Sequence, residues 1–277
     1  MPSGTVGKLL LRGMIAGLVA GLLAFVFAYT VGEGPVADSI ALEQTQSAPA
    51  SHHDHGAAGA GAGAGTAEHA EHEDEEEELV SRDLQSTAGL ATGVLVYGVA
   101  LGGIASLAFC FALGRVGRFG PRATAALVAG GAFTTLYLVP FLKYPATPPA
   151  VGNPDTIGQR TTLFFLMIAL SVLVGVAAVI LGRRLAARLG AWNATVAAGA
   201  GYAAVMAVLF AVLPDNGDAI RESFPAALLW DFRLASIGIQ AVLWVGFGLL
   251  FGALAQRLLT PAATPAPAAA PAAAPTA

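Results

Sequence analysis

The stretch that decides the fold is LLLRGMIAGLVAGLLAFVFAYTV, which occupies Leu9–Val31. A transmembrane helix needs about 20 predominantly apolar residues to cross the hydrocarbon layer of a bilayer. This run has that length, and Arg12 is its only charged residue. A secretory signal peptide is the alternative, because Lys8 and Arg12 precede the apolar residues. However, the run is longer than a usual signal-peptide core and no clear cleavage site follows it. We therefore interpret it as a retained first span.

The composition of the whole chain is that of a membrane protein. Of its 277 residues, 56% are hydrophobic and 12% are charged, and the mean hydropathy is +0.68. Soluble domains have about a quarter of their residues charged, so this chain has too few charges to cover a soluble surface. The fold class that we predict is an all-α polytopic membrane protein with six transmembrane helices. The predicted spans are Leu9–Val31, Ala88–Leu113, Ala123–Phe141, Thr161–Leu181, Ala194–Leu213 and Leu234–Leu254.

Lysine and arginine predict the orientation of the spans, because short cytoplasmic loops are enriched in both. With a cytoplasmic N-terminus, nine of these residues fall inside and five fall outside. The nine inside are Lys8, Arg12, Arg115, Arg118, Arg122, Arg183, Arg184, Arg188 and Arg257. The five outside are Arg82, Lys143, Arg160, Arg221 and Arg233. An even number of spans is needed to bring Arg257 inside. We therefore expect both termini in the cytoplasm (N-in/C-in).

The spans divide the chain into four parts. Residues 1–31 form the first transmembrane helix, and residues 32–86 form a flexible, disordered loop on the non-cytoplasmic side. Residues 87–257 form a five-helix transmembrane region, and residues 258–277 form a disordered Ala/Pro tail that cannot build a core. Glycines at four-residue spacing in the first, second and last spans predict closely packed helices.

The loop at 32–86 contains all five histidines of the chain and a dense group of carboxylates. Two His/acid clusters flank a Gly/Ala spacer at Gly56–Thr66, which would let both close on one ion. Imidazole and carboxylate together suit divalent first-row metals. The alternative is a solvated acidic loop that binds cations loosely. We predict exchangeable metal binding, at one site or at two, by His52, His53, Asp54, His55, His69, Glu71 and His72.

Charged residues near the predicted outer interface are candidates for an ion entrance or gate: Asp155, Arg160, Asp231 and Arg233. Asp155 and Asp231 are the carboxylates best placed to receive an ion from the loop, although helix capping explains Asp155 equally well. Ionisable residues, which mark ion paths in membranes, are almost absent from the spans. The polar and thioether groups there are few for a transporter that acts alone. They are Tyr97, Ser106, Thr134, Thr135, Tyr137, Ser171, Tyr202, Met206 and Gln240.

Several functional classes are disfavoured by what the sequence lacks. It has no Walker motif, which argues against ATP hydrolysis by that route, and no basic block that would suggest a nucleic-acid partner. The single cysteine, Cys110, cannot form a disulfide within the chain, and we interpret it as a buried apolar residue. No span carries a histidine, which argues against a bis-histidine haem protein and leaves a membrane enzyme with the least support. We expect no bound cofactor, with the metal as the transported ion.

Several segments together resemble the CbtA family. They are the run Leu9–Phe25, the acidic histidine loop, Tyr144-Pro145-Ala146, Pro149-Ala150-Val151-Gly152, Pro154-Asp155-Thr156-Ile157, Trp192-Asn193-Ala194-Thr195, Phe224-Pro225 and Leu229-Trp230-Asp231-Phe232-Arg233. CbtA proteins are described as predicted bacterial cobalt transporter subunits, linked with cobalamin synthesis. They are paired with a small single-span partner, CbtB. The family is commonly described with about five spans, one fewer than hydropathy and charge predict here.

Two functions stay open at this point. The resemblance implies a subunit for cobalt uptake in the bacterial cytoplasmic (inner) membrane, with an external loop that captures the ion and a CbtB-like partner. The second function is a membrane-anchored metal-binding or scaffold protein that conducts no ions itself. The residues alone favour a transition metal without distinguishing cobalt from its neighbours.

Overall fold

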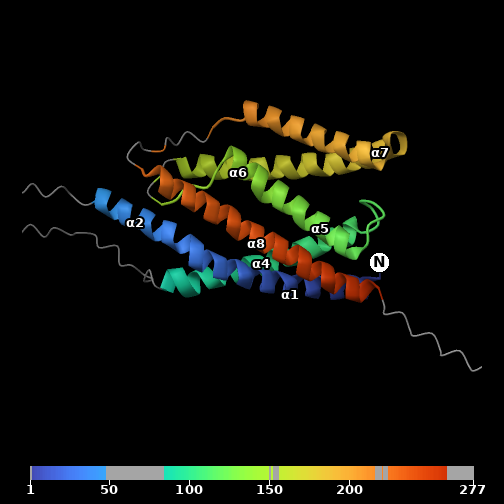
Figure 1. The fold of residues 1–277 in the computed structure, drawn as a ribbon, viewed down its shortest axis with the longest axis horizontal. Helices are drawn as coiled ribbons and strands as arrows, with labels where there is room; N and C mark the ends of the chain where they lie inside the picture. Colours follow the sequence, from blue (N-terminus) through green and yellow to red (C-terminus); the bar gives the residue numbers. More distant parts are fainter. Residues whose placement is uncertain are drawn as a thin grey trace, which may run out of the picture.

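The computed structural model describes residues 2–47, 84–149, 151, 156–215, 220 and 224–260. This part of the chain is helical with short connections and contains no strand (Figure 1). The five histidines, Asp155 and the residues after Thr260 lie outside it. Its elements are α1 (Ser3–Phe27), η1 (Ala28–Gly32), α2 (Glu33–Ser47), η2 (Gln85–Gly89), α4 (Leu90–Ala112), α5 (Pro121–Ala132), η3 (Phe133–Leu138), α6 (Val139–Lys143), α7 (Ile157–Val212) and α8 (Ala226–Leu259), where η denotes a π-helical segment.

Helical stretches long and apolar enough to cross a membrane confirm that this is a polytopic α-helical protein. By length and composition the described residues contain five of them: Ser3–Thr45, Gln85–Ala112, Pro121–Lys143, Ile157–Val212 and Ala226–Leu259. To within one residue, each of the six predicted runs falls within one of these stretches. The fourth and fifth runs share α7, which explains why the two counts differ.

The helix α7 is folded back on itself at Gly190. As a straight helix its 56 residues would be about 84 Å long, nearly three times the hydrocarbon thickness. Gly190 has φ 77° and ψ 161°, a conformation essentially restricted to glycine, and it separates an arm at 157–189 from an arm at 191–212. The hydroxyls of Ser171 and Tyr202, 31 residues apart, lie 2.7 Å from each other. A straight helix would separate these residues by about 46 Å, so the arms pack side by side in opposite directions.

The first helix continues beyond the predicted end of its span. After η1 the chain stays helical through α2, so the prediction of a flexible loop from residue 32 is wrong for Glu33–Ser47. Pro35 is tolerated because it lies within one turn of the π-helical segment. At Ser39 the buried hydroxyl donates a 2.7 Å hydrogen bond to the Pro35 carbonyl. Leu42 packs against the outer part of the bundle, a tertiary contact that apolar periodicity did not reveal.

Prolines follow two of the three π-helical segments, Pro35 after η1 and Pro140 after η3. Proline has no N–H for the carbonyl four residues before it, and its ring crowds that carbonyl. The wider turns of η1 and η3 accommodate this defect without ending the helix, so that α5, η3 and α6 form one continuous stretch.

The main core lies among α1, α4, α5 and α8. Leu9, Phe109 and Phe251 are fully buried there. Gly13 and Gly17 of α1 face Gly98 and Gly102 of α4 so closely that each glycine lies against the backbone of the opposite helix. Glycine permits this because it has no Cβ, which confirms the close packing expected from the glycine spacing.

A second core forms where α7 lies along η3 and α6, away from α1 and α4 (Figure 1). It contains Val139, Tyr144, Leu163, Met167 and Met206. The helices alternate in direction, since α1 runs antiparallel to α4 and to α8. One end of the molecule therefore holds the N-terminus, the α4–α5 connection, the turn of α7 and the end of α8, and the other holds α2 and the starts of α4 and α8 (Figure 1).

Candidate functional site

The histidine-rich segment is connected to the described helices at the end of the molecule that holds α2. The helix α2 ends at Ser47, and the described chain resumes at Leu84 just before η2. A small apolar cluster of Val151, Phe224 and Leu229, with Leu42 of α2 packed against it, joins α2 to the start of α8. The predicted metal ligands His52, His53, Asp54, His55, His69, Glu71 and His72 lie outside the described residues.

Three of the four candidate gate residues are described, and all lie near this same end. Asp231 is exposed in the first turns of α8. Arg233 is half-buried, and its Nε–H donates a 3.4 Å hydrogen bond to the carbonyl of Ala146. Arg160 is half-buried near the start of α7. Arg233 therefore bonds to the connection between α6 and α7 rather than pairing with Asp231.

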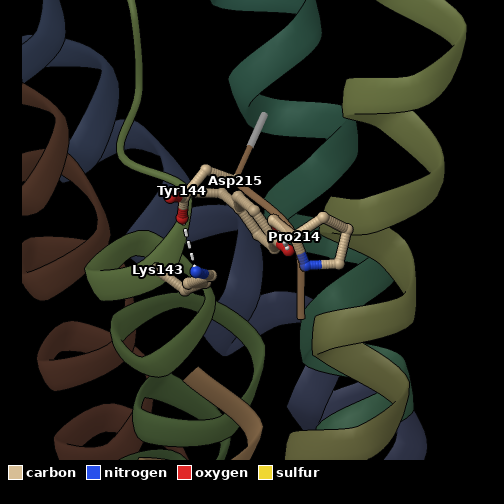
Figure 2. A network of polar contacts seen from close by, with 4 residues as sticks. All are labelled: Lys143, Tyr144, Pro214 and Asp215. Carbon is tan, nitrogen blue, oxygen red and sulfur yellow. Dashed lines mark hydrogen bonds and ion pairs between the residues drawn. The ribbon is translucent and has the colours of Figure 1, made fainter. Parts of the chain in front are cut away.

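A polar network fastens the end of α6 to the end of α7 (Figure 2). Lys143 Nζ lies 2.6 Å from Asp215 Oδ1, although the Asp215 side chain is 89% exposed and such a pair contributes little to stability. The Tyr144 hydroxyl donates a 2.8 Å hydrogen bond to the carbonyl of Pro214. Burial raises the pKa of the Tyr144 phenol, so it stays protonated as a donor. The sequence placed these residues in two separate loops and did not pair them.

Polar side chains from three elements meet on the inner face of α8. The Tyr137 hydroxyl of η3 donates to Ser236 Oγ at 3.0 Å. One turn further along α8, the Gln240 side chain lies beside the side chain of Tyr97 on α4, which is 47% exposed. The sequence named Tyr97, Tyr137 and Gln240 as separate polar groups; the structure brings them together and adds Ser236, which the sequence reading missed.

A second polar group lies between the two arms of α7. The Ser171–Tyr202 hydrogen bond is flanked one turn away by Met167 and Met206, both buried. Thr135 of η3 approaches the same place, because its Cγ2 lies 3.1 Å from the position a Cβ would take at Gly175. This group therefore connects the α7 arms to the α5–η3–α6 stretch.

The opposite end of the bundle is closed by an arginine. Arg12 Nη1 of α1 donates a 2.6 Å hydrogen bond to the carbonyl of Leu254 on α8. This bond connects the first and last helices near the N-terminus, on the N-terminal side of the core that contains Phe109 and Phe251. It satisfies a charged side chain close to the membrane boundary.

Among the described residues no group of three or more His, Cys, Asp or Glu side chains is arranged to hold a metal ion. What the described helices offer instead is neutral oxygen from hydroxyl and amide groups, together with the thioethers of Met167 and Met206. Neutral oxygens bind a divalent cation weakly and release it readily. Such groups suit a path through which an ion moves better than a site that binds the ion tightly.

Comparison with known proteins gives one family. A family model described as "Probable cobalt transporter subunit (CbtA)" matches residues 6–256. Neither the curated proteins nor the solved structures include a match to the chain. Because the family model covers most of the sequence, the chain belongs to the CbtA family of probable cobalt transporter subunits.

Proposed function

We propose that this chain is a membrane subunit of an uptake transporter for cobalt or a related divalent transition metal. The observation that carries the proposal is the CbtA match over residues 6–256. It falls on a chain with five helical stretches apolar enough to cross a membrane. A transporter subunit accounts for both features and fits a non-enzymatic role. The location that we propose is the cytoplasmic (inner) membrane of a bacterium.

The membrane topology that we propose has six spans with both termini in the cytoplasm. Support comes from α7, whose two arms are each long enough to cross the hydrocarbon layer and run in opposite directions. Counted as two spans, they bring the total to six. The basic residues expected inside then belong to the segments gathered at one end: the start of α1, the α4–α5 connection, the turn of α7 and the end of α8 (Figure 1).

Cysteine labelling tests this topology. In a Cys110→Ala background, we expect Trp192→Cys to react only with a membrane-impermeant maleimide on the cytoplasmic side. Trp192 follows Gly190 and is 79% exposed. Ile220→Cys, beyond the second arm and 40% exposed, is expected to react only from outside. Labelling of both positions from the same side would show that the second arm does not cross the membrane.

We further propose that the histidine-rich loop captures the ion outside. Support comes from the ligand chemistry of His52, His53, Asp54, His55, His69, Glu71 and His72, which suits divalent transition metals. The helices that flank this loop lie at the end opposite the basic segments (Figure 1). Arg160, Asp231 and Arg233 lie at that same end, and Asp155 precedes α7 in the sequence but lies outside the described residues. We propose these four residues as the entrance that receives the captured ion.

The alternative is a metal-binding scaffold that conducts no ions. What favours it is the scarcity of ionisable side chains between the described helices, where a path would need polar groups.

A transporter could obtain these groups from a partner. A small single-span partner of the CbtB kind, with its own histidines, would supply the ionisable side chains that the described helices lack. We propose such a partner for this reason.

Flux into liposomes distinguishes the two functions. The purified chain is reconstituted with a metal-sensitive dye inside, alone and together with the single-span partner. We expect Co²⁺ influx above that of protein-free liposomes in at least one of these preparations, and no comparable Mg²⁺ influx. A scaffold gives no influx in either preparation, and that result would overturn the transport function. Repeating the assay with Ni²⁺ and Zn²⁺ establishes the metal preference.

A further inference from the structure

The inner face of α8 changes from polar to aromatic along its length. Ser236, Gln240, Trp244, Phe247 and Phe251 recur at spacings of three and four residues, which places them on one side of the helix. The first two are half-buried, and the last three are almost completely buried. This side of α8 packs against α1, α4 and α5, so it lies in the interior of the bundle.

The polar part of this face is a group of four side chains without any charge: Tyr97, Tyr137, Ser236 and Gln240. Tyr137 donates to Ser236 Oγ at 3.0 Å, and one helical turn away Gln240 lies beside Tyr97, which is 47% exposed. The four side chains therefore come from α4, η3 and α8 and lie near one another. The π-helical segment η3 beside it is a feature that often accompanies functional sites.

The side-chain oxygen of Gln240 is in an environment that simple packing does not explain. Its Oε1 is buried and has no hydrogen-bond partner among the described residues. A side-chain amide has two polar ends, a donor NH₂ and an acceptor oxygen, and each needs a partner when it is buried. A buried carbonyl oxygen without a partner is costly at membrane depth, so it calls for a ligand, an ion or a water.

Directly beyond Gln240 the bundle is closed by apolar groups. A small cavity between α1, α4 and α8 is lined by Gly17, Gly98 and Trp244, where Gly98 follows Tyr97 and Trp244 lies one turn after Gln240. Beyond it the Phe247 and Phe251 rings stack with centroids 5.2 Å apart, and Phe109 meets Phe251 edge-on at 5.0 Å. The polar group is thus shut off from the end that carries the N-terminus.

We propose that Tyr97, Tyr137, Ser236 and Gln240 form a resting site for a partly hydrated divalent cation inside the membrane. The aromatic side chains of Trp244, Phe247 and Phe251 close this site on the cytoplasmic side. Gln240 Oε1 is the oxygen free to bind the ion or its water, and the absence of charge keeps binding weak enough for the ion to leave. This inference rests on the proposed transport function.

Replacing Gln240 tests the site against the alternative that these groups only hold the helices together. We expect Gln240→Leu, a side chain of similar size, to lower Co²⁺ influx into liposomes at least tenfold without lowering the melting temperature. Gln256→Leu is the matched control, since Gln256 lies on the same helix near its end and bonds to Thr260. It is expected to leave influx unchanged. Unchanged influx in Gln240→Leu would overturn the proposal.

Gln240→Glu gives a second measurement that does not depend on flux. It is made in a chain whose five histidines are replaced by asparagine, so that the loop contributes no imidazole. We expect equilibrium dialysis of the purified protein to show Co²⁺ binding at least tenfold tighter than in the same chain with Gln240. No gain would overturn the site. If the unmodified chain conducts no Co²⁺ with or without its partner, the transport function fails, and this binding measurement still decides the site.

Discussion

Gly17→Ala is expected to break the close backbone contact between α1 and α4. A Cβ at residue 17 would collide with the carbonyl of Gly98 on α4 and would lie 3.0 Å from the Cα of Gly102. The obstructing atoms are backbone, so no side chain can rotate away and the helices themselves must separate. We expect a loss of about 3 kcal/mol, at the upper end of the usual cost of overpacking a core. The melting temperature in detergent and the monodisperse fraction on size exclusion measure this loss.

Gly93→Ala is the matched control for this prediction. Gly93 lies on α4, but apart from its own helix backbone no described atom lies within 4 Å of the position of its added Cβ. Alanine favours helix over glycine by about 0.5–1 kcal/mol, so this variant is expected to melt at the same temperature or slightly higher. Equal melting temperatures for the two variants would mean that α1 and α4 are not packed through their glycines.

Replacing all five histidines by asparagine is expected to reduce cobalt uptake at limiting cobalt by about tenfold. This corresponds to a loss of roughly 1.4 kcal/mol in the free energy of cobalt binding by the loop. Asparagine keeps the loop polar but removes the imidazole nitrogens that suit divalent transition metals. At saturating cobalt we expect uptake to recover, because the loop raises the local ion concentration without forming the path. Cobalt accumulation in cells, measured across a range of concentrations, gives both values.

The matched control for the histidines removes charge and keeps imidazole. Replacing the four glutamates Glu75–Glu78 by glutamine lowers the acidity of the loop beside His69 and His72. If the histidines are the ligands, this variant is expected to retain most of its uptake at limiting cobalt. An equal loss in both variants would indicate loose attraction by the acidic loop. Unchanged uptake in the histidine variant would rule out the capture role.

The positions of the apolar helices could be predicted from the sequence because membrane insertion depends on local hydropathy. To within one residue, all six predicted runs lie within helices, and the glycine spacing in α1 and α4 correctly indicated a close interface. The extension of the first helix through α2 was not predicted, because its composition is mixed and Pro35 normally ends a helix. The wider π-helical turn that accommodates Pro35 leaves no recognisable pattern in the sequence.

The sequence by itself determined the helical membrane fold class, the apolar runs and the distribution of charge and histidine along the chain. Only the tertiary structure decided which polar groups meet. Tyr137 meets Ser236 across 99 residues, Ser171 meets Tyr202 across the turn at Gly190, and Gln240 lies beside Tyr97. The physical reason is that hydropathy acts on each segment separately. The partner of a side chain depends on how every helix is rotated about its axis and against which neighbour it packs.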